Sequence, residues 1–204
     1  METEQLKRIL SRHALYLLTE GEDGEVANLQ RSDFSHFDLE SADLRYANLN
    51  YANLSHADLS AVDFRDCKIR YANLSDSYLG SAFFIKADLT GSDLNNSYLN
   101  CADFSFANLT CADLRGATVE ETDFRYSVLT NATFSESDLR NCKLNEANLT
   151  KANLSGANLT NVDLTSAILT DANLSHADLR GANLTNVDLT GANLTGAKMD
   201  TLNS

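Results

Sequence analysis

Every fifth residue from Leu29 to Met199 is large and apolar, and this phase never slips. A short internal repeat of this kind constrains the architecture more strongly than any local propensity. We call the large residue position i. Position i−2 is nearly always small, as at Ala27 and Ala47, position i−1 is mostly Asn or Asp, and positions i+1 and i+2 are mostly polar. The repeating unit therefore reads A-(N/D)-L-x-x.

The five-residue period predicts an extended chain that bends at regular intervals. In an extended segment, positions i−2 and i lie on the same face because side chains alternate with a period of two. The next inward residue is i+3, an odd step that a straight strand cannot make without turning over. A helix is excluded, because a five-residue period drifts around a 3.6-residue turn and leaves no lasting apolar stripe. We expect one bend in every unit.

The exceptions to Leu at position i indicate how many units close one turn. Phe occupies four successive centres that are spaced by twenty residues: Phe64, Phe84, Phe104 and Phe124. Thr repeats the same interval outside the core: Thr90, Thr110, Thr130, Thr150, Thr170 and Thr190. Both patterns predict a square solenoid with four units per coil. Its coils, about nine in number, would stack like residues at roughly 4.8 Å, the spacing of hydrogen-bonded strands.

The unit A-(N/D)-L-x-x, sustained over residues 27–201, resembles the pentapeptide-repeat protein family, in its uninterrupted bacterial form. The resemblance implies an all-β solenoid: a right-handed quadrilateral β-helix with positions i and i−2 inside. Handedness comes from the resemblance alone. Members of this family differ widely in what they bind, so the resemblance specifies the fold more closely than the function.

We expect three segments in this chain: an N-terminal capping helix with its connector at 1–26, the β-helix at 27–201 and a short tail at 202–204. From residue 3 to about residue 18 the spacing is helical, with an apolar face of Leu6, Ile9, Leu10 and Leu17. Such a helix would cover the first coil of the solenoid. The alternative is an amphipathic helix that binds a partner or a membrane surface.

No comparable cap follows the last repeat, where Ala197-Lys198-Met199 leads to Asp-Thr-Leu-Asn-Ser. An open coil of this kind pairs with a second molecule, frays, or is protected by its polar end. A homodimer through the C-terminal coil is therefore a hypothesis.

The charge balance argues against several classes of partner. A net charge of −13 and a pI near 4.5 disfavour direct binding to nucleic acid, because a phosphate backbone is bound by Lys and Arg. No apolar run approaches transmembrane length, and the N-terminus does not have the pattern of a signal peptide. We expect a cytoplasmic protein that does not contact membranes.

The cysteines and histidines do not predict a disulfide or a metal centre. Cys67 and Cys142 take the inward i−2 position several coils apart, whereas Cys101 and Cys111 take the outward i+2 position on different edges. We interpret the first two as buried small residues and the others as surface thiols. His36, His56 and Asp76 stack in one column. A straight column is poorly placed for tetrahedral closure around a metal, so we expect a solvated corner, no metal and no cofactor.

The departures from the repeat supply the candidate site. Position i−1 carries aromatic residues at Tyr78, Phe83 and Tyr98, and Phe83 is followed on its strand by Ile85. On the same outward face, opposite charges two residues apart predict a stacked charge ladder: Asp43 with Arg45, Asp63 with Arg65 and Asp123 with Arg125. Phe83 and Ile85 replace one such pair with hydrocarbon. The outward residues that we predict to form a partner-binding cluster are Tyr78, Phe83, Ile85, Tyr98, Phe106 and Tyr126. The alternative is that these rings pack on one another and stiffen the rod.

The sequence contains no Gly-rich phosphate loop and no nucleophile with a base that stands apart from the repeat. We therefore expect a non-enzymatic scaffold that binds a protein partner of unknown identity. The alternative comes from the resemblance: some family members mimic DNA and inhibit DNA gyrase or related type II topoisomerases, which gives quinolone resistance. The acidic balance fits this role, but Arg45, Arg65 and Arg125 interrupt the acidic column.

Overall fold

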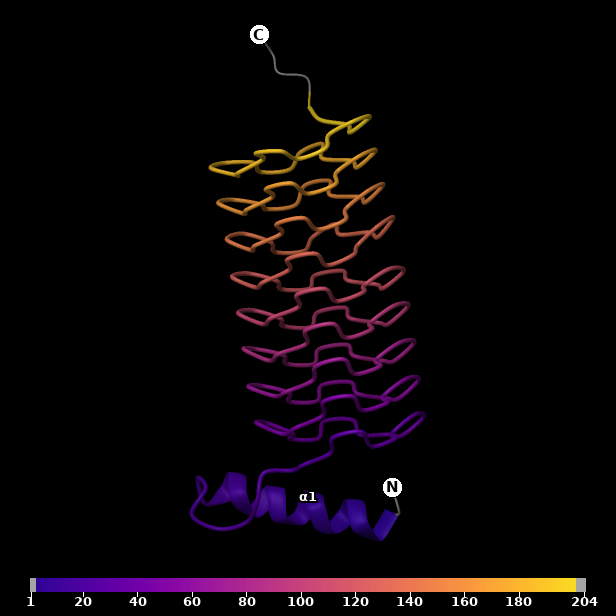
Figure 1. Cartoon of the computed structure of the whole chain (residues 1–204), viewed down its shortest axis with the longest axis vertical. Coiled ribbons are helices and arrows are strands. Elements are labelled where there is room, and N and C mark those ends of the chain that lie inside the picture. Colours follow the sequence, from indigo (N-terminus) through magenta and orange to yellow (C-terminus); the bar gives the residue numbers. More distant parts are fainter. Residues whose placement is uncertain (1–2, 201–204) are drawn as a thin grey trace.

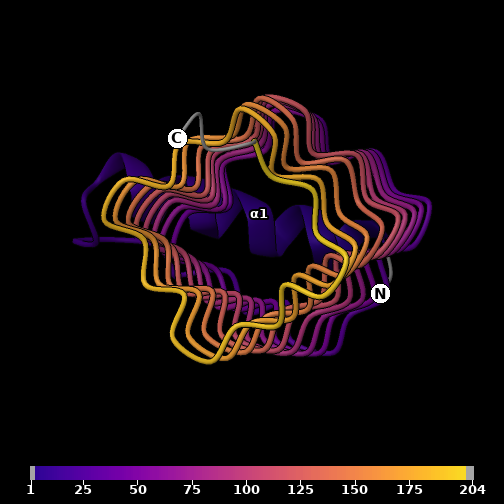
Figure 2. The ribbon, with the colours of Figure 1, turned by 90° about the horizontal axis from the view of Figure 1, so that it is seen from above.

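The computed structural model describes residues 3–200. One helix, α1 (Thr3–Leu18), lies across one end of a stack of coils, and the chain climbs away from it toward the C-terminus (Figure 1). Seen along the stack, the coils superpose as a four-sided outline (Figure 2). The expected tail at 202–204 lies outside the described residues.

The coils are joined by parallel β-bridges between residues twenty apart, all at position i−1. The series runs from Asn28 with Asn48 to Asp178 with Lys198. A regular bridge has two backbone bonds: Leu29 N–H donates to the Asn48 carbonyl at 2.8 Å, and Asn48 N–H donates to the Ala27 carbonyl at 2.9 Å. The twenty-residue register predicted from the Phe and Thr intervals is confirmed.

The predicted bend falls at position i+2. Every residue at this position from Arg31 to Gly196 has a positive φ, and most of them are not glycine. A left-handed residue with a Cβ costs on the order of 1 kcal/mol. A hydrogen bond between coils offsets part of this cost. The N–H of the bend residue donates to a carbonyl of the next coil, as from Arg31 to Asn50 at 3.0 Å.

The Asn or Asp at position i−1 stabilises the same bend from outside. Its side-chain oxygen accepts a hydrogen bond from the backbone N–H two residues later, as from Ser35 to Asp33 Oδ1 at 3.0 Å. This Asx turn favours the local conformation. Asparagines also bond between coils, since Asn53 Nδ2 donates to Asp33 Oδ1 at 3.0 Å. The repeated Asn and Asp are thus a structural requirement before they are a functional surface.

The centres at position i and the small residues at i−2 fill the interior. The four predicted Phe centres are fully buried, and their rings stack face to face from Phe64 through Phe84 and Phe104 to Phe124. Each buried Leu or Phe contributes on the order of 1.5–3 kcal/mol before conformational entropy is subtracted. In the last coil, the centres Leu184, Leu189 and Leu194 are only half-buried.

Helix α1 packs its apolar face on the first coil. Leu6 is buried there and Ile9 and Leu10 contact the same core, as expected for a cap, whereas Leu17 is only half-buried. The sequence interpretation did not include His13 in this face. Its ring is 1% exposed, and its Nδ1 accepts the Ala27 N–H at 3.2 Å. Neither α1 nor any other segment within residues 3–200 forms a helix long and apolar enough to cross a bilayer.

Candidate interaction surfaces

Two sides of the solenoid carry the candidate residues. We call one the Phe83 face; its outward i−1 residues are Asp43, Asp63, Phe83, Asp103, Asp123, Lys143, Asp163 and Asn183. We call the other the Tyr98 face; its outward i−1 residues are Asp38, Asp58, Tyr78, Tyr98, Thr118, Asp138, Asn158, Asp178 and Lys198. The two faces adjoin at a corner of the square.

The Phe83 face bears the predicted ladder of opposite charges. Arg45 Nε donates to Asp43 Oδ1 at 2.9 Å, and Arg65 and Arg125 make the same bond to Asp63 and Asp123. Contacts between coils extend the ladder, since Arg45 Nε also lies 3.7 Å from Asp63 Oδ2. Most of the acidic charge on this face is therefore balanced locally.

Phe83 and Ile85 interrupt this ladder with hydrocarbon. Phe83 bridges Asp63 in one neighbouring coil and Asp103 in the other, so the ladder register continues through it. Its side chain is 43% exposed, whereas Ile85 is half-buried. The outward direction predicted for Phe83 is thus correct, and Ile85 presents less surface than Phe83.

The other four predicted residues form two stacked pairs. Tyr78 and Tyr98 stack on the Tyr98 face with ring centroids 4.9 Å apart. Phe106 and Tyr126 stack at a corner with centroids 4.7 Å apart. All four are between 41% and 53% exposed. Within the described residues, neither pair stacks on Phe83, so the six residues form three separate apolar patches.

The sequence interpretation missed a further aromatic column. Tyr51 stacks on Tyr71 with centroids 5.4 Å apart, and the Arg31 guanidinium lies 5.5 Å from the Tyr51 ring centroid. The Tyr71 ring extends over Gly91, where a Cβ would lie 2.6 Å from it. The signal was available, because Arg31, Tyr51, Tyr71 and Gly91 follow at twenty-residue intervals at position i+2.

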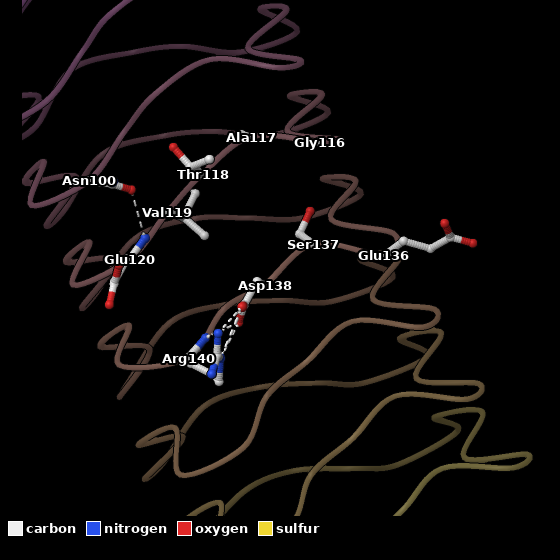
Figure 3. Close-up of a pocket in the computed structure, with 10 residues that line it drawn as sticks. All are labelled: Asn100, Gly116, Ala117, Thr118, Val119, Glu120, Glu136, Ser137, Asp138 and Arg140. Atoms are coloured by element: carbon white, nitrogen blue, oxygen red, sulfur yellow. Dashed lines mark hydrogen bonds and ion pairs between the residues drawn. The ribbon is translucent and has the colours of Figure 1, made fainter.

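The sequence interpretation did not predict that the ladder opens between two coils. In the described chain, Thr118 and Asp138 are the one pair missing from the series of bridges. A cleft of about 360 Å³ lies at this place, and Figure 3 shows its lining. The lining residues are Asn100, Gly116, Ala117, Thr118, Val119, Glu120, Glu136, Ser137, Asp138 and Arg140.

Several features of the sequence coincide at the cleft. Val119 is the one valine at position i, where most centres are Leu or Phe. The facing edges carry Glu120 on one side and Glu136 with Asp138 on the other. A smaller core residue weakens packing between the coils. Arg140 compensates one of these charges; its hydrogen bonds hold the pKa of Asp138 below its usual range.

The burial of the cysteines and the stacking of His36 on His56 follow the columns read from the sequence. Cys67 and Cys142 are buried free thiols, Cys101 and Cys111 are exposed free thiols, and burial raises the pKa of Cys142 to about 12. His36 and His56 stack with centroids 4.9 Å apart. Among residues 3–200, no group of three or more His, Cys, Asp or Glu is placed to hold a metal ion.

Comparisons with known proteins agree with this architecture. The model of the family described as pentapeptide repeats matches in eight copies, over residues 27–60, 57–96, 87–125, 127–165 and 167–201. A search of curated proteins gives no match.

Solved structures with this fold are similar to the chain over most of its length. A trypsin-treated variant of QnrB1, a plasmid-mediated fluoroquinolone resistance protein, is 27% identical with a TM-score of 0.61; the match covers 85% of this chain and 87% of QnrB1. HetL, a pentapeptide repeat protein involved in heterocyst differentiation regulation in the cyanobacterium Nostoc sp. strain PCC 7120, is 29% identical with a TM-score of 0.45; the match covers 91% of this chain and 94% of HetL. Since the family model matches nearly all of the repeat that the bridges join into coils, this chain belongs to the pentapeptide repeat family.

Proposed function

We propose that this protein is a non-enzymatic scaffold that binds a protein partner through the aromatic residues on its Phe83 and Tyr98 faces. The observation that carries the proposal is that apolar Phe83 and Ile85 stand at the positions that hold an Asp–Arg ion pair in three other coils of the same face: Asp43 with Arg45, Asp63 with Arg65 and Asp123 with Arg125. Exposed aromatic residues on a polar surface are typical anchors of protein interfaces. The stacked Tyr78 and Tyr98 lie on the adjoining face and extend the same surface.

A pull-down from host lysate tests the proposal. The double variant Phe83→Ser with Ile85→Ser should retain the fold, because Phe83 points outward, and should lose a partner that the wild type retains. The matched control is Tyr51→Ser with Tyr71→Ser, which removes an exposed stacked pair elsewhere. Loss of the same partner in both variants, or in neither, would count against the proposed surface.

The stiffening alternative predicts a different result for the same variant. If the apolar residues serve mainly to pack on their neighbours, Phe83→Ser with Ile85→Ser should lower the free energy of unfolding by more than about 1 kcal/mol. If these residues serve as an interaction surface, the free energy of unfolding should fall by less than this amount. Urea unfolding followed by circular dichroism measures the fall and so separates the stiffening interpretation from the interaction interpretation.

A second candidate function is binding to DNA gyrase or a related topoisomerase, in the manner of a quinolone-resistance protein. It is supported by the similarity to QnrB1 and by the net charge of −13. The ion pairs of Arg45, Arg65 and Arg125 with neighbouring Asp residues weigh against it, because they neutralise the column that would imitate phosphates. Protection of gyrase supercoiling from ciprofloxacin by the purified protein would favour this candidate.

A homodimer through the last coil remains a hypothesis, motivated by the half-buried centres Leu184, Leu189 and Leu194. Light scattering over a range of protein concentrations tests it. A constant monomer mass would remove it.

A further inference from the structure

The cleft between the coils of Thr118 and Asp138 exposes unpaired backbone groups on both of its edges. In the regular ladder, Asp138 N–H would donate to the Ala117 carbonyl and Val119 N–H to the Asp138 carbonyl. Neither bond forms, although the equivalent bond one coil earlier, from Leu99 N–H to the Thr118 carbonyl, is 2.8 Å long.

The opening continues past these two bonds. The N–H groups of Gly116 and Glu121 also lack the bonds to the next coil that their counterparts Asn96 and Cys101 make. Within the described residues, these N–H groups have no protein acceptor, and the carbonyls they would reach have no protein donor. A row of unpaired N–H and carbonyl groups on a strand edge is a template for pairing with another chain. An opening of this extent therefore favours an occupant that both donates and accepts hydrogen bonds.

The walls of the cleft define the side chains that such an occupant carries. Ala117, Val119 and Ser137 are each at most 5% exposed and form its inner wall. The exposed carboxylates of Glu120 and Glu136 stand at its rim, and Arg140 is engaged by Asp138 with Nη2 and Oδ2 2.6 Å apart. Figure 3 shows Glu120 and Glu136 on opposite sides of the opening. The cleft is thus closed inside by small, nearly buried side chains and negatively charged at its mouth.

We propose that this cleft binds an extended, basic peptide segment of a partner protein, which pairs with the open backbone edges. An extended peptide presents N–H and carbonyl groups on both sides, as strand addition requires. Its side chains alternate, so those that point inward are small and apolar while Arg or Lys residues face Glu120 and Glu136. The cleft volume lies within the range of about 300–1,000 Å³ that is usual for binding pockets.

This inference rests on the proposed interaction role and specifies the chemistry of one partner segment. The cleft also continues the proposed aromatic surface, because Thr118 bridges Tyr98 on the same face. A segment seated in the cleft therefore lies beside the stacked tyrosines, where the rest of the partner would contact them.

Fluorescence anisotropy with defined peptides tests the proposal on the full-length purified protein. The probe is a fluorescein-labelled heptapeptide, Ser-Val-Arg-Val-Arg-Val-Ser. One comparison peptide carries Glu in place of Arg, and another carries an N-methyl group on the central valine, which removes one backbone donor. We expect the basic peptide to bind, the acidic peptide not to bind, and N-methylation to weaken binding about tenfold, as for the loss of one buried hydrogen bond.

Paired variants locate the binding. Glu120→Gln with Glu136→Gln removes two exposed charges at the rim and should weaken binding of the basic peptide about tenfold. The control, Glu40→Gln with Glu146→Gln, removes two exposed charges away from the cleft and should leave binding nearly unchanged. Both variants keep the aromatic residues.

The proposal is overturned if the basic peptide shows no binding up to about 1 mM, if the acidic peptide binds equally, or if N-methylation has no effect. Equal weakening by the rim variant and its control would also overturn it, since binding would then follow net charge alone. A failure here leaves the lysate experiment on Phe83 and Ile85 untouched. Failure of that experiment likewise leaves the peptide result standing.

Discussion

The rings of Phe84 and Phe104 stack with centroids 4.5 Å apart and planes inclined by 3°, although the two residues are twenty positions apart in sequence. Phe104 also stacks on Phe124, so it lies within a continuous column of rings. We expect Phe104→Ala to lower the free energy of unfolding by about 3–5 kcal/mol, through lost burial and the cavity left in the column.

Chemical denaturation followed by circular dichroism measures this loss. The matched control is Phe106→Ala, which removes an exposed ring two residues away and should cost less than about 1.5 kcal/mol. Equal costs for the two variants would contradict the assignment of inward and outward positions.

The connector after helix α1 depends on Gly24. Its φ is +81°, and a Cβ there would clash with the Arg12 carbonyl oxygen and the Tyr16 nitrogen, both of them backbone atoms. Gly24→Ala should therefore displace the cap and lower stability by more than about 2 kcal/mol. Amide exchange of residues in α1, compared with residues in the coils, measures the displacement.

Gly21→Ala is the matched control for this prediction. Gly21 also has a positive φ, but its nearest neighbour is the Tyr16 ring at 3.3 Å, which can move. Its effect on α1 should be smaller. If the two variants expose α1 equally, backbone strain alone explains both results and the contact with Arg12 is unimportant.

His13 makes the docking of α1 depend on pH. Burial lowers its pKa; nearby Asp43 opposes this effect and Arg45 adds to it. Because the pKa of the folded state lies below the unfolded value near 6.5, the unfolded state binds more protons in the interval between the two. The stability that neutral His13 contributes is therefore complete above about pH 6.5 and is lost as pH falls through the folded-state pKa.

Protection of α1 amides at pH 5 and pH 7.5 measures this dependence. His13→Leu removes the acceptor of the Ala27 N–H, which should cost about 1–3 kcal/mol and flatten the difference between the two pH values. A pH dependence that persists in the variant would assign the effect to other groups.

Asp123 makes the charge ladder sensitive to acid. Burial raises its pKa, but hydrogen bonds from the side chain and backbone of Arg125, with the charges of Arg125 and Lys143, outweigh burial and leave the pKa below its usual range. The contribution of ionised Asp123 is complete above the unfolded value near 3.9 and is lost as pH falls through the lower folded-state pKa.

Thermal unfolding between pH 2 and pH 6 checks this prediction. Asp123→Asn should reduce the fall in Tm below pH 4. Arg125→Gln should also reduce this fall and lower Tm at pH 6, because without these donors the folded-state pKa of Asp123 moves back toward the unfolded value. An unchanged acid profile in both variants would show that other carboxylates dominate.

The fold was readable from sequence because one physical requirement repeats in every unit. The odd step from i to i+3 required a bend, and the structure places a left-handed residue at each i+2 position, from Arg31 onward. The Phe64 to Phe124 interval predicted the register, and helical spacing predicted the α1 cap. His13 was missed in that cap because a histidine is usually assigned to the polar side of a helix.

The surface was less predictable. Sequence columns place Tyr78 beside Tyr98, but they do not reveal which rings touch across a corner, since that depends on side-chain rotamers. The break between Thr118 and Asp138 was not predicted at all. The apolar phase continues through Val119, so the inward pattern is intact while the backbone bonds beside it are missing. The five-residue apolar pattern predicts which side chains are buried, but it does not directly predict which backbone groups pair between coils.

Residue-resolved amide exchange tests most directly whether the ladder is continuous with an opening at the cleft. Val119 and Leu99 are matched amides on the Tyr98 face, as are Asp138 and Asn158. Leu99 donates to Thr118 at 2.8 Å and Asn158 donates to Ser137 at 2.9 Å, so both should exchange slowly. We expect Val119 and Asp138 to exchange at least about a hundredfold faster in the free protein. Equal protection of all four amides would contradict the open ladder and remove the cleft.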